Sequence, residues 1–79
     1  MERYLIMADN YGIVYTVGLS DSYYNALIRC KDYNEEVGDA NCHFFVVRVS
    51  DGQTWNYKDG RVVKIVLHND AVETKEVAI

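Results

Sequence analysis

The residues best suited to chemistry are two cysteines and two histidines, from which a thiolate nucleophile and a general base could be built. They are Cys30, Cys42, His43 and His68. Their spacing matches no zinc-ligand pattern, and no Cys-x-x-Cys occurs. Each histidine falls at an end of a β-rich run, where a surface or half-buried position is typical. Without a secretory signal, reduced cysteines acting as small apolar residues are expected, and a Cys30–Cys42 disulfide is the alternative.

The sequence contains none of the short motifs that mark common enzyme families. It has no phosphate-binding Gly-x-x-x-x-Gly-Lys, no dinucleotide-binding Gly-x-Gly-x-x-Gly, no His-Glu-x-x-His and no Gly-x-Ser-x-Gly. A chain of this length also has little room for both a core and a pocket that excludes water. We therefore expect a protein that is not an enzyme and that uses neither a cofactor nor a metal.

Four carboxylates gather at the end of the predicted helix. They are Asp32, Glu35, Glu36 and Asp39, and no basic residue interrupts them after Lys31. Negative charge near a helix C-terminus opposes the helix dipole, which is unfavourable. One interpretation is a solvated helix end. The other is an acidic patch that faces basic groups of a partner.

Aromatic residues are the second conspicuous group, because they make up 13% of the chain. Tyrosine and tryptophan supply core volume, and they are also enriched at binding hot spots. Several lie on or beside predicted strands: Tyr4, Tyr11, Tyr15, Trp55 and Tyr57. An RNA-stacking sheet would need basic residues beside them, whereas the chain has a net charge of −4 and a pI near 4.9. Direct nucleic-acid binding is therefore not expected.

The first half of the chain predicts a hairpin and a helix. Strands are expected at about 2–8 and 12–18, separated by a turn that contains Gly12. A helix is expected at about 20–34, with Ser20 as the N-cap and its end near Gly38. Its apolar face is predicted from helical spacing and consists of Tyr23, Ala26, Leu27 and Cys30, widened by Tyr24 and Ile28.

The stretch Cys42–Leu67 predicts a three-stranded antiparallel meander, because two Asp-Gly pairs separate three β-rich runs. Alternation along these runs places large apolar side chains on both faces of the sheet. One helix covers only one face, so the question is what covers Phe44, Val46, Val62 and Val66. Sheet curvature, self-association and a docked protein are the three alternatives.

Together these elements predict a single domain over residues 1–79 of the α+β class. One amphipathic helix packs on a bent antiparallel sheet of about five strands in the order ββαβββ, and residues 72–79 could form a short additional strand. No run of apolar residues is long enough for a membrane helix, so no membrane association and a cytoplasmic location are expected.

This layout resembles the small phage-encoded inhibitors, in particular some anti-CRISPR proteins, several of which pack a single helix on a bent antiparallel sheet. The residues that carry the resemblance are the helix around residues 23–28 and the two Asp-Gly hairpins. The resemblance is one of layout, size and composition and includes no signature motif.

The resemblance implies stoichiometric inhibition of a host defence complex that processes nucleic acid, in the cytoplasm of the host cell. Acidic side chains would then take the place of phosphates against arginine and lysine. It points first to Asp32, Glu35, Glu36 and Asp39, then to Asp51 and Asp59 at the hairpin turns. The aromatic anchors would be Tyr11, Trp55 and Tyr57. The alternative function is a small structural or regulatory module that works as a homodimer or larger homo-oligomer.

Overall fold

The computed structural model describes residues 2–58, 60–68 and 71–77. Its elements, in chain order, are β1 (Tyr4–Asn10), β2 (Ile13–Ser20), α1 (Tyr23–Glu36), β3 (Cys42–Arg48), β4 (Thr54–Lys58), β5 (Arg61–His68) and β6 (Ala71–Val77). The predicted α+β class and the order ββαβββ are confirmed. The predicted additional strand is present as β6 and pairs along β5.

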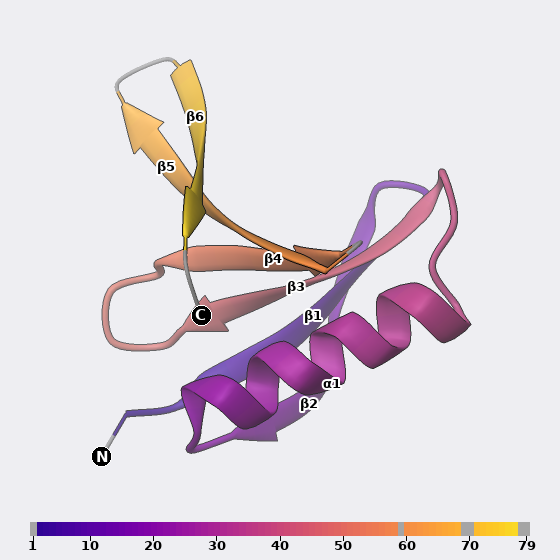
Figure 1. Ribbon diagram of the computed structural model, residues 1–79, viewed down its shortest axis with the longest axis horizontal. Coiled ribbons are helices and arrows are strands. Elements are labelled where there is room, and N and C mark those ends of the chain that lie inside the picture. The colour runs from indigo at the N-terminus through magenta and orange to yellow at the C-terminus, as the bar shows by residue number, and fades with distance from the viewer. Residues whose placement is uncertain (1, 59, 69–70, 78–79) are drawn as a thin grey trace.

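The strands form one open antiparallel sheet in the order β2-β1-β3-β4-β5-β6. The helix lies against β1, β3 and β4 and touches β2, while the backbones of β5 and β6 have no close approach to it within the described ranges. Figure 1 shows the β5–β6 hairpin turning away from the helix. The helix therefore covers one face of the first four strands, and within the described residues no helix covers the other face. No helix in the described part of the chain is long and apolar enough to cross a membrane.

The β1–β2 hairpin closes through a two-residue turn at Tyr11 and Gly12. Both residues have positive φ, 53° and 85° respectively, which is the pattern of the type I′ turn that suits the twist of two paired strands. The Asp9 carboxylate accepts a hydrogen bond from the Gly12 N–H at 2.9 Å. The pairing register shifts between Ile6 and Met7, where β2 contains a bulge.

The helix begins two residues later than predicted, because its N-cap is Ser22 rather than Ser20. Ser22 has extended backbone angles, and its hydroxyl accepts a hydrogen bond from the Asn25 N–H at 3.3 Å. Ser20 still belongs to β2, and its hydroxyl accepts from the Ser22 N–H at 3.1 Å. The predicted helix face was too wide: Ala26, Leu27 and Cys30 are buried, whereas Tyr24 and Ile28 are exposed.

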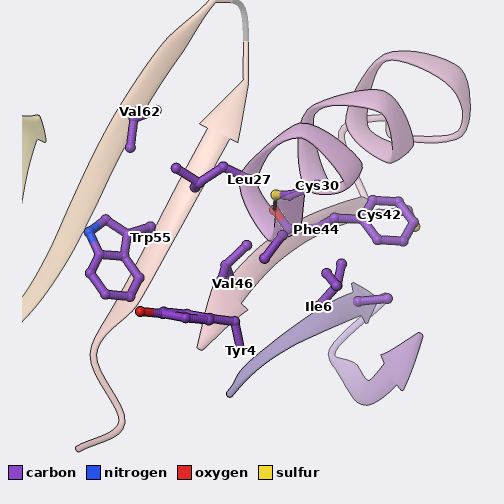
Figure 2. Close-up of a cluster of buried hydrophobic side chains, with 11 residues drawn as sticks. Tyr4, Ile6, Leu27, Cys30, Cys42, Phe44, Val46, Trp55 and Val62 are labelled. Atoms are coloured by element: carbon purple, nitrogen blue, oxygen red, sulfur yellow. Dashed lines mark hydrogen bonds between the residues drawn. The ribbon is translucent and has the colours of Figure 1, made fainter. Parts of the chain in front are cut away.

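The sequence did not show what covers the face of the sheet that contains Phe44 and Val46. In the structure, the helix covers this face. Phe44, Val46 and Val62 are buried beneath α1, with relative exposures of 5%, 0% and 2%. Figure 2 shows Cys30 of the helix pointing toward Phe44 and Val46, with Ile6 of β1 nearby, while Leu27 points toward β4 on the side of Val62 and Trp55. Their neighbours Phe45 and Val47 lie on the opposite face and are only half-buried. The side chain of Val66 lies outside the described residues.

Candidate functional site

A buried asparagine holds the end of the helix against the sheet. Asn34 is 5% exposed and lies where β3 and β4 stop pairing. Its Oδ1 accepts from the Phe44 N–H at 2.8 Å, and its Nδ2 donates to the carbonyls of Phe44 at 3.1 Å and Tyr57 at 3.0 Å. One side chain thus forms hydrogen bonds with backbone groups of β3 and β4 at a point where the two strands no longer bond to each other. The sequence pattern did not single out Asn34 as a functional residue; the available signal was a polar residue four positions after Cys30 on the apolar face.

The end of the helix and the tip of the first hairpin are joined. After Glu36 the chain turns tightly, and Gly38 donates to the Tyr33 carbonyl at 3.0 Å. A Cβ on Gly38 would lie 2.5 Å from the Asn34 carbonyl oxygen, so only glycine fits this approach. The Tyr11 N–H then donates to the Asn41 carbonyl at 2.8 Å. The tip of the hairpin and the helix end therefore form one continuous surface.

We call this surface the hairpin end and define it by Tyr11, Glu36, Val37 and Asp39, all of which are exposed. Tyr11 is the most exposed large hydrophobic residue described, at 73%. Its φ of 53° lies in the left-handed region, where asparagine or glycine normally sits. The Asp39 carboxylate accepts from the Asn41 N–H at 2.8 Å, which orders the loop beside it.

The four carboxylates of the predicted acidic patch are exposed, but they are not equivalent. Glu35 pairs with Lys31 one helical turn away at 3.3 Å, and this contact raises the pKa of the Lys31 ammonium. Asp39 is engaged by its own loop. Among the described residues, Asp32 and Glu36 make no ion pair or hydrogen bond with their carboxylates. These two are thus the carboxylates most available to a partner.

Asp51 lies far from the patch, because β3 separates the two ends of the sheet. The Arg48 guanidinium donates to both Asp51 oxygens, at 2.9 Å and 2.5 Å, and the Gln53 N–H donates at 3.0 Å. These donors lower the pKa of the Asp51 carboxyl to about 2. The structure therefore gives Asp51 a role within the β3–β4 turn and does not bring it to the hairpin end. Asp59 lies outside the described residues.

The predicted aromatic anchors are separated by the fold. Trp55 is buried at 6% exposure, with its ring centroid 5.1 Å from Tyr23 and 6.4 Å from Tyr4. The Arg48 guanidinium covers the remaining side of the indole at 5.3 Å. Tyr57 packs against the same core. Trp55 is thus a core residue and not a surface anchor, and only Tyr11 of the three stands free of the core.

Among the described side chains, no hydrogen bond joins a cysteine to a histidine as a nucleophile and base would require. Both cysteines are free and buried. Cys30 Sγ donates to the Phe44 carbonyl at 3.3 Å, and burial raises the pKa of its thiol to about 11. His43 lies 3.7 Å from the Asp9 carboxylate on the uncovered face. The side chain of His68 lies outside the described residues, and no cluster of three metal-ligating side chains occurs among those described.

A shallow hollow of about 420 Å³ lies at the other end of the helix, beside its N-terminus. Its lining is mainly polar and consists of Arg3, Leu19, Ser20, Asp21, Asn25 and Arg29. Arg29 is already engaged, because its guanidinium donates to the Leu19 carbonyl at 3.3 Å. The hollow is therefore a polar seam between β2 and α1 rather than an enclosed pocket.

Comparison with protein-family models, with curated proteins and with solved structures found no match to this chain.

Proposed function

We propose that this chain is a small non-enzymatic protein that binds another protein through the hairpin end and inhibits it stoichiometrically. The observation that carries the proposal is the conformation of Tyr11. A bulky aromatic residue in the left-handed region costs about 1–2 kcal/mol, and here the side chain gains nothing from the core in return, since it is 73% exposed. Such a cost at an exposed aromatic tip is typical of a residue kept for contact with a partner.

The charge around Tyr11 supports a partner with a basic surface. Glu36 and Asp39 are exposed at the hairpin end and Asp32 is exposed one helical turn before Glu36, and no described cation pairs with Asp32 or Glu36. A rigid aromatic anchor flanked by carboxylates fits a surface that carries arginine and lysine around an apolar recess. In its narrowest form, the proposal is that the target is the nucleic-acid-binding groove of a defence complex. Carboxylates would then occupy phosphate positions, as in an anti-CRISPR protein.

Tyr11→Asn is the sharpest test, because folding and binding should change in opposite directions. Asparagine followed by glycine suits the type I′ turn, so the variant should be about 1 kcal/mol more stable than the wild type in urea denaturation. Binding should weaken about tenfold or more, because the aromatic anchor is lost. Both quantities are measured on the purified protein, with target capture from lysates of candidate host cells followed by quantitative mass spectrometry.

Tyr24→Ala is the matched control, since Tyr24 is an exposed tyrosine on the helix, away from the hairpin end. It should retain every target that the wild type captures. The proposal is contradicted by either of two results, at moderate salt and across the relevant hosts. The wild type captures no protein, or Tyr11→Asn captures every protein that the wild type captures.

The contribution of charge is tested by reversing Glu36 to lysine. Capture should fall, and the remaining binding should depend less on salt, because fewer charge pairs are screened. Asp21→Lys, an exposed carboxylate at the other end of the helix, serves as the control. Equal loss in both variants would assign the effect to net charge and remove the hairpin end from the proposal.

A further inference from the structure

Strand β2 is an exposed edge of the sheet, and the bulge near its middle is its main protection among the described residues. Only β1 pairs with it, and its outer side is bare within the described residues. Ile13, Val14, Tyr15 and Leu19 are exposed at 70%, 51%, 44% and 48%. The strand contains no charged residue and no proline, which are the features that normally prevent an edge from pairing with another chain.

The unpaired backbone groups of β2 follow from its register. The turn at Tyr11 and Gly12 is closed by Asn10 and Ile13, and such a closing pair is hydrogen-bonded. Hydrogen-bonded and non-hydrogen-bonded pairs then alternate along the hairpin. Val14 and Thr16, opposite Asp9 and Met7, therefore direct their N–H and C=O groups away from β1. The bulge after Thr16 ends this regular stretch.

The residues of this stretch are symmetric about Tyr15. Val14 and Thr16, on either side of Tyr15, are both β-branched; Val17 already lies in the bulge and has no partner in β1. We propose that β2 pairs antiparallel with β2 of a second copy of this chain, around a two-fold axis at Tyr15. Val14 of each copy then forms the hydrogen-bonded pair with Thr16 of the other, and four backbone hydrogen bonds complete both edges.

The side chains of this pairing are compatible on both faces. The two Tyr15 residues form a non-hydrogen-bonded pair, in which side chains approach most closely and aromatic pairs are favourable. No like charges meet, because the strand has none. The chain's net charge of −4 would oppose close association elsewhere, so a strand free of charge is the suitable place for it.

A second copy fits this edge better than an unrelated peptide, because one short sequence supplies both matching halves. The other edge, β6, is a poorer candidate, since Glu73, Lys75 and Glu76 lie within it. The bulge after Thr16 limits the regular ladder to residues 14–16, three residues per copy. The contact is therefore smaller than the roughly 800 Å² per partner of a standard stable interface, and dimerisation should depend on concentration.

The first measurement is the mass of the full chain by sedimentation velocity over a wide concentration range. The proposal expects a shift from 9.1 kDa toward twice that mass as concentration rises. It is overturned if the protein stays a monomer up to about 1 mM, where an edge pairing of useful strength would already be populated.

The second measurement tests the two-fold axis. In Tyr15→Lys, two lysines face each other across the axis, and the dissociation constant should rise at least tenfold; Tyr15→Glu should behave alike. Mixing the two variants should restore the dimer, because lysine then faces glutamate. Tyr24→Lys makes the same charge change at an exposed site on the helix and should leave the dimer intact.

Two results would overturn the pairing even if the wild type dimerises: a dimer that survives Tyr15→Lys unchanged, or a mixture of the two Tyr15 variants that stays monomeric. Folding of each variant is checked by circular dichroism. Should Tyr15→Lys fail to fold, Tyr15→Cys replaces it. The proposed axis would place the two new thiols within disulfide distance, whereas Leu19→Cys, outside the ladder, should cross-link much less. The test is independent of the proposed function, because Tyr11 lies outside the ladder.

Discussion

The two faces of the sheet are built from the same kinds of residue, but their side chains differ in how far they are buried. Phe44 and Val46 on the helix side are almost fully buried, while Phe45 and Val47, their direct neighbours, are half-buried on the other side. Polar groups follow the same division. Asn34 on the covered side makes three bonds to strand backbone, whereas the buried Oδ1 of Asn56 on the uncovered side has no partner among the described residues.

The difference shows that apolar alternation alone does not make a core. A strand residue becomes core only when a second layer covers it, and here that layer is one helix over part of the sheet. Substitutions that compare equivalent positions on the two faces measure how much the helix contributes.

The largest contrast is expected between Phe44→Ala and Phe45→Ala. Phe44 is 5% exposed and stacks on Tyr33 at 5.0 Å, so truncation should cost about 3–5 kcal/mol of unfolding free energy. Phe45 is half-buried and should cost less than about half as much. Urea denaturation of both variants measures the pair. Equal losses would mean that the uncovered face is as well packed as the covered one.

Asn34→Ala should destabilise the protein by about 2–4 kcal/mol, because it leaves backbone groups of Phe44 and Tyr57 buried and unpaired. Hydrogen exchange should also show faster opening where β3 and β4 diverge. Asn25→Ala is the control, since Asn25 is exposed on the same helix and alanine favours helix. A loss for Asn34→Ala no greater than that of the control would refute this role.

Alkaline pH should weaken the covered face through Cys30. Burial raises the pKa of the folded-state thiol to about 11, above the unfolded value near 9, so stability is present below pH 9 and is lost as pH rises toward 11. The loss should reach about 2–3 kcal/mol, from two pH units at 1.4 kcal/mol each. Cys30→Ser keeps the hydrogen bond without titrating, so its stability should fall less steeply over that range. Parallel pH profiles would show that Cys30 contributes nothing.

The smallest effect is expected from the exposed Arg48–Asp51 pair. The pKa of Asp51 is lowered to about 2, below its unfolded value near 4, so its stabilising contribution is present above pH 4 and is lost as pH falls toward 2. Asp51→Asn should therefore lose less stability over that range than the wild type, and salt should reduce the difference.

Local sequence rules were sufficient for the element order. Gly12, Gly52 and Gly60 mark the turns through positive φ, and β-branched runs mark the strands between them. Helical spacing located α1 and the buried residues Ala26, Leu27 and Cys30. The N-cap was misplaced by two residues because Ser20 and Ser22 have the same capping chemistry, and only the length of β2 distinguishes them.

The candidate site was less predictable, because its members meet only in three dimensions. The sequence indicated Tyr11 and the carboxylates Glu36 and Asp39, yet nothing in it showed that the hairpin tip bonds to the loop after the helix. It also grouped Trp55 with Tyr11, although one is core and the other exposed.

The sequence by itself determined the periodicity, the turns, the acidic balance and the uncharged character of β2, since these depend on residues near one another in the chain. The tertiary structure alone decided which face of the sheet the helix covers. Alternation with a period of two makes both faces of the sheet apolar, so either face could become the core. The β2–α1 connection places the helix on one side, and that face is therefore the one that is buried. The same step buried Trp55, gave Asn34 its partners and left Tyr11 and the edge of β2 at the surface.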